Sequence, residues 1–126
     1  MDVMVVDDSP VLRERLKLML SEVLGTVCGV SAADGATAME ILRSTNPDIV
    51  ILDIRMPGRN GIEVLRDVKR EAPRTKVIML TNYPTPEHRK VCEAAGADYF
   101  FDKSRELGAV LEVLEQLTLY NPEAAG

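Results

Sequence analysis

The chain has few of the residues that mark a specialised fold. It has two cysteines and no tryptophan, and only 4% of its 126 residues are aromatic. Cys28 and Cys92 fit neither a zinc spacing nor a disulfide framework. We therefore expect both to be reduced and buried, and to pack as small hydrophobic residues in a reducing compartment. No apolar run reaches the roughly 18 residues that cross a bilayer, and residues 1–3 lack the basic region of a secretory signal. These absences favour a cytoplasmic protein without a membrane span.

An excess of positive charge is also missing. The net charge is -5, and the lysines and arginines are scattered along the chain. A nucleic-acid surface needs a basic patch, so we expect no direct binding of nucleic acid. With 46% hydrophobic and 28% charged residues, the composition is that of an ordinary globular domain. We expect one domain over residues 1–120 and a short flexible tail over 121–126.

Apolar strand patterns alternate with helical patterns along the whole chain. We predict strands over residues 2–6, 26–31, 48–52, 76–81 and 99–101. The first predicted helix begins at Ser9–Pro10, a capping hydroxyl followed by proline, and ends at Gly25. Gly29 interrupts the second strand, and Ser104 is a candidate cap for the last helix. Five strand–helix repeats imply an α/β fold, a doubly wound five-stranded parallel sheet with five helices on both faces.

Carboxylates close two of the predicted strands. Asp7 and Asp8 follow one apolar run, and Asp53 follows another. If these strands are parallel neighbours, three like charges meet at one edge, and their pKa values rise unless a cation joins them. The pattern predicts a Mg2+ site, in which Mn2+ can substitute. Taken singly, Asp7 or Asp8 is also a good helix cap, and Asp53 a good turn residue.

A hydroxyl and an ammonium group close two further strands. Thr81 ends the fourth strand, and Lys103 lies two residues beyond the fifth. Alone, each is more often an ordinary strand or surface residue. However, Lys103 precedes a helix start, where a cation opposes the helix dipole. That placement is better explained if an anion binds nearby.

Four motifs, in this order, resemble the receiver domain of two-component response regulators. They are residues 5–9 (VVDDS), 51–58 (ILDIRMPG), 79–81 (MLT) and 95–103 (AGADYFFDK). The resemblance covers residues 1 to about 117. It implies a flavodoxin-like sheet with strand order 2-1-3-4-5.

The resemblance also implies a role for each acidic position. Asp53 is expected to be the phosphoacceptor. Asp8 and Asp53 are expected to bind Mg2+ through their carboxylates, Arg55 through its backbone carbonyl, and Asp7 through a coordinated water. The physics agrees, because a divalent ion screens the repulsion between a carboxylate and an incoming phosphoryl group.

The remaining implied roles concern the phosphoryl oxygens and the response. Thr81 and Lys103 are expected to contact those oxygens, and Thr81 and Phe100 to form the switch. Phosphorylation is expected to reshape the surface of the fourth helix, fifth strand and fifth helix. The implied partners are a histidine kinase or phosphotransfer protein and a downstream target protein, and the implied state is a monomer or weak dimer.

Three residues depart from the usual receiver pattern. Asn82 is larger than the residue typical after the threonine and is expected to narrow access to the phosphoryl group. Ser104 stands where many receivers have proline, and Phe100 lacks the hydroxyl of the more common tyrosine. No output domain follows residue 117, which leaves open a stand-alone receiver or one excised from a longer protein.

Two other functions stay open at this point. The first is a Mg2+-dependent phosphatase with an aspartyl nucleophile. Such enzymes generally carry an acid two residues after the nucleophile, where this chain has Arg55. The second is a receiver-like interaction module that is never phosphorylated. Because all the acids and the lysine are retained, we predict a phosphorylated module that is not a turnover enzyme.

Overall fold

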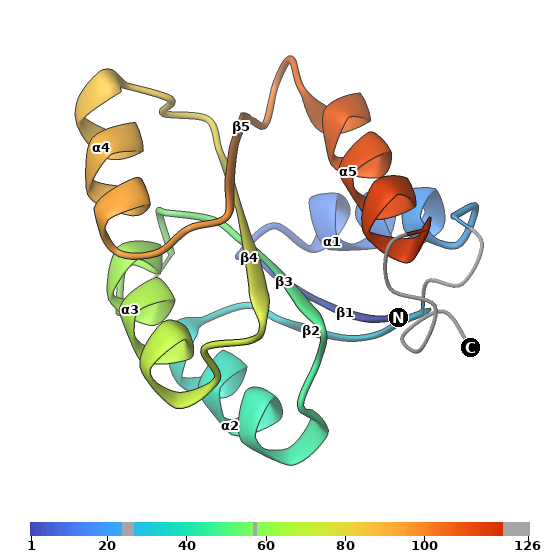
Figure 1. The fold of residues 1–126 in the computed structure, drawn as a ribbon, viewed down its shortest axis with the longest axis horizontal. Helices are drawn as coiled ribbons and strands as arrows, with labels where there is room; N and C mark the ends of the chain where they lie inside the picture. The colour runs from blue at the N-terminus through green and yellow to red at the C-terminus, as the bar shows by residue number, and fades with distance from the viewer. Residues whose placement is uncertain (24–26, 57, 120–126) are drawn as a thin grey trace.

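A computed structural model describes residues 1–23, 27–56 and 58–119, with the side chains of 27–29 left aside. Strands and helices alternate as predicted (Figure 1). The elements are β1 (Asp2–Val6), α1 (Pro10–Leu20), β2 (Val27–Ala32), α2 (Gly35–Thr45), β3 (Ile49–Leu52), α3 (Gly61–Glu71), β4 (Lys76–Thr81), α4 (Pro86–Ala94), β5 (Tyr99–Asp102) and α5 (Leu107–Leu119).

The five strands form one parallel sheet in the order β2-β1-β3-β4-β5. Helices α1 and α5 cover one face, and α2, α3 and α4 cover the other (Figure 1). The predicted doubly wound fold and its strand order are therefore confirmed.

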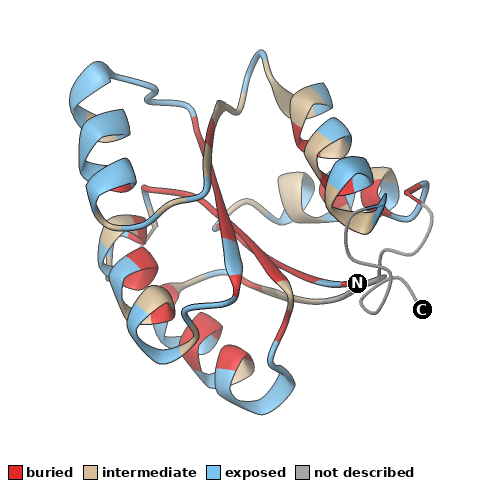
Figure 2. Cartoon of the chain, in the orientation of Figure 1, coloured by how far each residue is buried: buried red, intermediate tan, exposed pale blue. Residues whose placement is uncertain are grey.

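Side chains of the central strands alternate between two hydrophobic clusters. Met4 and Val50 pack on the side of α2 and α3, whereas Val3 and Ile49 pack on the side of α1 and α5. Both faces are covered, so β3 is apolar at every position, and β1 and β4 are apolar except at their ends, at Asp2, Lys76 and Thr81. Figure 2 shows the central strands mostly buried and the helices buried only on their inner sides. Of α4, Cys92 alone is fully buried, as predicted for this cysteine; the side chain of Cys28 lies outside the described residues.

Helix α1 begins as predicted but ends early. The Ser9 hydroxyl accepts a hydrogen bond from the Leu12 amide at 3.3 Å, and Pro10 occupies the first turn. The helix ends at Leu20 and not at Gly25, which is outside the described residues. After Ser21 the backbone bonds tighten, from Glu22 to Met19 and from Val23 to Leu20. Val23 is still buried, so the apolar period runs past the point where the helix stops.

Two further boundaries concern β2 and α5. Asp2 and Met4 pair with Val27 and Val30, so β2 carries one extra residue where Gly29 interrupts the pattern. The prediction that Ser104 caps α5 is wrong. The Ser104 amide and hydroxyl both bond the Asp102 carboxylate, which holds a turn there.

Residues 120–126 lie outside the described part of the chain, so the predicted tail over 121–126 stays a prediction. Among the described residues, no helix combines the length and the apolar character needed to cross a membrane.

Candidate functional site

Neighbouring strands bring the predicted carboxylates together. Val6 pairs with Leu52 across β1 and β3, and the Asp53 amide donates to the Val6 carbonyl at 3.0 Å. One carboxylate oxygen from each of Asp7, Asp8 and Asp53 lies within 4.8 Å of the others. Asp7 and Asp53 are buried, and Asp8 is exposed at the rim. The convergence expected from the sequence is present.

Lys103 binds two of these carboxylates. Its Nζ donates to Asp7 Oδ2 at 2.5 Å and to Asp53 Oδ2 at 3.0 Å. Its backbone amide donates to the Thr81 carbonyl at 2.8 Å, which holds the lysine at the end of β4. The loop after β5 therefore reaches Asp53, directly after the end of β3.

Burial and charge act against each other at this cluster. Burial raises the pKa of Asp53, and Asp7 adds to that rise, while the hydrogen bond and charge of Lys103 reduce it. Burial also opposes the charge of Lys103, but the two carboxylates outweigh it and raise the pKa of the lysine. The carboxylates therefore favour the charged form of Lys103, whereas at Asp53 burial outweighs the effect of the lysine.

The two predicted switch residues are both buried. The Thr81 hydroxyl accepts a hydrogen bond from the Tyr83 amide at 3.0 Å. Phe100 pairs in register with Met79 on β4, and the Arg89 guanidinium of α4 lies 4.7 Å from its ring centroid. The side chain of Phe100 is therefore in contact with α4, the helix expected to respond.

A cavity of about 310 Å³ opens over the carboxylates. Across its rim, the Arg55 guanidinium lies 3.7 Å from the centroid of the Tyr83 ring. This stacked pair joins the loop after β3 to the loop after β4. Asn82 lines the same cavity, and its expected narrowing of access to the phosphoryl group stays a prediction. Tyr83 was not predicted; its position two residues after Thr81 was the available signal.

The start of α3 lies against the backbone of Asp53 and Ile54. The Gly61 amide donates to the Ile54 carbonyl at 2.6 Å. A Cβ at Gly61 would lie 1.8 Å from the Asp53 carbonyl oxygen. Only glycine therefore fits there. Gly61 was also missed, because its role depends on this approach.

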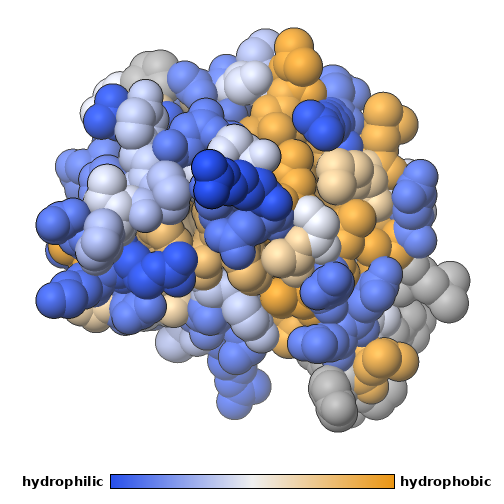
Figure 3. All heavy atoms as spheres, turned by 90° about the horizontal axis from the view of Figure 1, so that it is seen from above, coloured by the Kyte–Doolittle hydropathy of each residue, from blue (hydrophilic) through white to orange (hydrophobic). Residues whose placement is uncertain are grey.

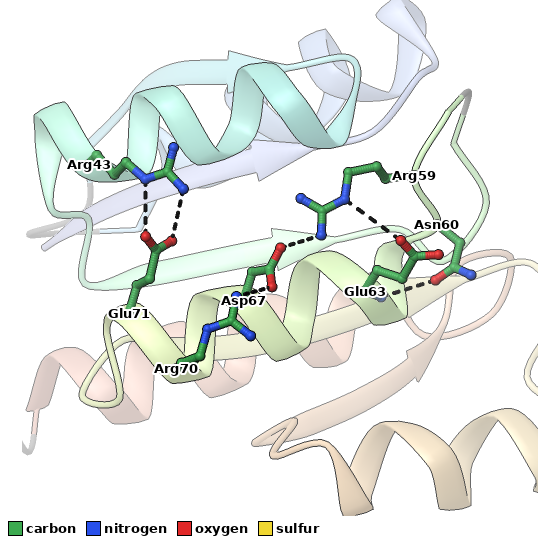
Figure 4. Close-up of polar contacts among 7 residues, drawn as sticks. All are labelled: Arg43, Arg59, Asn60, Glu63, Asp67, Arg70 and Glu71. Carbon is green, nitrogen blue, oxygen red and sulfur yellow. Dashed lines mark hydrogen bonds and ion pairs between the residues drawn. The ribbon is translucent and has the colours of Figure 1, made fainter.

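Ion pairs hold the same loop to α3. Arg59 contacts both Asp67 and Glu63, and the Asn60 side chain caps the helix by accepting from the Glu63 amide (Figure 4). The loop that follows Asp53 is thus fixed at both ends.

The donor set suits a hard divalent cation. Mg2+ prefers oxygen ligands, needs few of them from protein, and keeps several waters. The cluster offers carboxylate oxygens from three aspartates. Lys103 and the Ser9 amide already occupy both oxygens of Asp7. Asp53 likewise accepts from Lys103 and from the Arg55 amide. Asp8 therefore has the most oxygen lone pairs left for a metal.

The comparisons with known proteins agree with this geometry. The model of the response regulator receiver domain matches residues 3–115. The chain belongs to this family. Protein CcdB of Bacillus subtilis is 38% identical to it over 117 residues, which cover 91% of this chain and 95% of that protein. A protein-glutamate methylesterase/protein-glutamine glutaminase of Nitratidesulfovibrio vulgaris is 37% identical, covering 92% of this chain and 29% of that protein.

A solved structure of the chemotaxis protein CheY4 from Vibrio cholerae is also similar, with a TM-score of 0.81 and 29% identity. It covers 91% of this chain and 96% of that one. Three other curated relatives are longer, and the receiver chain spans 38%, 52% and 30% of their lengths. The chain is thus a receiver domain of two-component response regulators, and its acidic pocket is consistent with phosphoacceptor signalling.

Proposed function

We propose that Asp53 accepts a phosphoryl group from a histidine kinase or phosphotransfer protein. A carboxylate oxygen of Asp53 forms the new bond to phosphorus, and the bond from phosphorus to the donor's imidazole nitrogen breaks. The imidazole leaves with the bonding electron pair and takes up a proton. The observation that carries this proposal is the grouping of Asp53 with two further carboxylates and Lys103 in one cavity.

Asp8, Asp53 and the Arg55 carbonyl are the proposed Mg2+ ligands, with Asp7 acting through a water. The ion would neutralise charge between the carboxylate and the incoming phosphoryl group. Asp7 also holds Lys103 in place through its 2.5 Å bond. From that position the ammonium can exchange its hydrogen bond to Asp53 for one to a phosphoryl oxygen when Asp53 is phosphorylated.

Thr81 is proposed to bind the phosphoryl group through its hydroxyl. Accepting from the Tyr83 amide uses a lone pair and leaves the hydroxyl proton to be donated. Moving Thr81 would change that bond and the loop before α4. Phe100, packed under Arg89, would carry the change to the surface of α4, β5 and α5, where a downstream protein binds.

The finer features of the function follow the same proposal. The receiver acts in the cytoplasm as residues 1–120, as a monomer or weak dimer, and binds no nucleic acid directly. It catalyses its own phosphorylation and dephosphorylation only. Arg55 supports that view, because a guanidinium stacked on Tyr83 has no proton to give as a general acid.

Intact mass spectrometry with a small phosphodonor and Mg2+ tests the proposal. We expect one added phosphoryl group, and none when EDTA is present. Asp53→Asn should remove it, and Asp2→Asn, at the far end of β1, is the matched control that should not. Labelling of Asp53→Asn at the wild-type level would refute the assignment.

A further inference from the structure

The outer side of α1 combines two exposed apolar residues with two opposite charges. Val11 is 78% exposed and Leu18 is 71% exposed. They are seven residues apart and therefore lie on the same side of the helix. Between them, also facing outward, are Glu14 and Arg15. The inward stripe of the helix is separate and is formed by Leu16 and Leu20.

These four outward residues are complementary to themselves. In an antiparallel pair of α1 helices related by a two-fold axis between positions 14 and 15, Val11 faces Leu18 of the second copy. Glu14 then faces Arg15 of the second copy, and the symmetry repeats both contacts. A two-fold interface requires this reciprocity: if residue i contacts residue j of the second copy, then residue j contacts residue i of the second copy. The sequence Val-Glu-Arg-Leu at positions 11, 14, 15 and 18 meets that requirement.

The described structure leaves these groups available. The nearest cation to Glu14 is Lys17, at 3.6 Å in the same helix, and the Glu14 side chain is still 73% exposed. Arg15 is exposed and makes no ion pair with any residue of the described ranges. In the view of Figure 3, hydrophobic surface gathers on the side of α1 and α5, whereas the α3 and α4 side is mostly hydrophilic.

We infer that α1 is a self-association surface that pairs two copies of this chain through residues 11, 14, 15 and 18. Four side chains per copy bury much less than the roughly 800 Å² per partner of a stable complex. The dimer is therefore weak, with a dissociation constant on the order of 100 μM. Ser9 and Leu12, at the start of the same helix, line the cavity over the carboxylates. Pairing places the end of the second copy's α1 near the mouth of that cavity.

Sedimentation equilibrium of the full chain, from about 10 μM to about 1 mM, measures the association directly. We expect the weight-average mass of the wild type to rise across this range. Glu14→Arg and Arg15→Glu should each weaken association by about tenfold or more, because each places like charges opposite one another. The double variant Glu14→Arg/Arg15→Glu should restore it, and so should an equimolar mixture of the two single variants.

Val91→Glu on α4 is the matched control, since Val91 is also an exposed apolar residue and should leave association unchanged. Circular dichroism confirms that each variant keeps its helices. A wild type that stays monomeric to about 1 mM would overturn the inference. So would single reversals without effect, or a double variant that stays monomeric, because that pattern indicates a different protein as the occupant of α1. None of these outcomes depends on phosphorylation of Asp53.

Discussion

The two faces of the sheet are held in different ways. On the α2–α3 side, Arg43 of α2 pairs with Glu71 of α3, and Arg59 ties the loop after β3 to Asp67 (Figure 4). On the other side, no ion pair among the described residues joins α1 to α5. These two helices meet the sheet mainly through apolar residues, although Arg13 of α1 also donates to the Asp7 carbonyl at the end of β1. Helix α1 leaves more apolar residues exposed at its outer surface.

This difference separates two contributions to the fold: apolar burial, which attaches the helices to the sheet (adhesion), and directional ion pairs, which fix their positions (alignment). Both faces have fully buried apolar clusters of similar kind, and apolar burial provides most of the stability. Ion pairs at the surface add little stability but require particular distances and directions. The face that positions the loop after Asp53 has such pairs between its elements, whereas on the α1–α5 face the described residues form one only within α1.

The largest effects should come from the two cores, and they should be equal. Leu65 of α3 and Leu114 of α5 are both fully buried, one on each face. Leu65→Ala and Leu114→Ala should each lower the free energy of unfolding by about 2–5 kcal/mol through lost burial and a cavity. Urea denaturation measures both. If Leu114→Ala costs far less than Leu65→Ala, the two faces differ in adhesion as well.

A matched pair of glycines should show the difference in alignment. Gly61→Ala places its Cβ against the Asp53 carbonyl oxygen, so we expect a loss of about 2–3 kcal/mol and slower phosphorylation. Gly108, in the first turn of α5, has no atom within 4 Å of an added Cβ. Gly108→Ala should therefore be neutral or stabilise by up to about 1 kcal/mol. Thermal unfolding and the rate of phosphorylation are the measurements; equal behaviour of the two variants would contradict the comparison.

The third effect is that of the buried Asp53 carboxylate, at the edge of the sheet, on thermal stability. Burial raises the pKa of Asp53, so its ionisation costs stability. That cost is absent below the unfolded pKa and complete above the folded pKa. Without divalent metal at neutral pH, Asp53→Asn should raise the melting temperature modestly, and the gain should vanish in acid. Added Mg2+ should stabilise the wild type more than the variant. A variant that melts below the wild type at pH 7 without metal would show that the Lys103 bond outweighs burial.

The smallest effect should come from the surface ion pairs. Glu71→Gln removes the partner of Arg43, and the exposed pair should contribute under about 1 kcal/mol. Raising the salt concentration should shrink the difference from the wild type. Glu112→Gln on α5, where no described cation lies within ion-pair distance, should change nothing. A loss above about 2 kcal/mol for Glu71→Gln would mean that the pairs also hold the face together.

Much of the fold was readable from the sequence because burial on both faces leaves runs of apolar residues. The carboxyl ends of those runs located Asp7, Asp53 and Thr81 without any coordinates. The end of α1 was not readable, since Val23 continues the apolar period after the backbone has turned. Ser104 looked like a cap, but α5 begins only at Leu107, and the Ser104 hydroxyl donates to the Asp102 carboxylate.

The missed residues share one property. Gly61 and Tyr83 act through segments that meet only in the folded chain, one against the Asp53 backbone and the other against Arg55. Single-sequence patterns report local periodicity and contain no distance between such segments. The direct bonds from Lys103 to Asp7 and Asp53 were unforeseen for the same reason.

The ammonium of Lys103, bonded to two aspartates, partly neutralises the net charge of the pocket. Three carboxylates and one ammonium sum to a formal charge of -3 + 1 = -2. A single divalent ion brings that sum to zero, so a dianionic donor would approach a cluster with no net charge to repel it. The proposed transfer would replace one carboxylate charge by about two phosphoryl charges, which would leave the cluster near -1. The receiver would then signal, in part, as a surface that has gained one uncompensated negative charge.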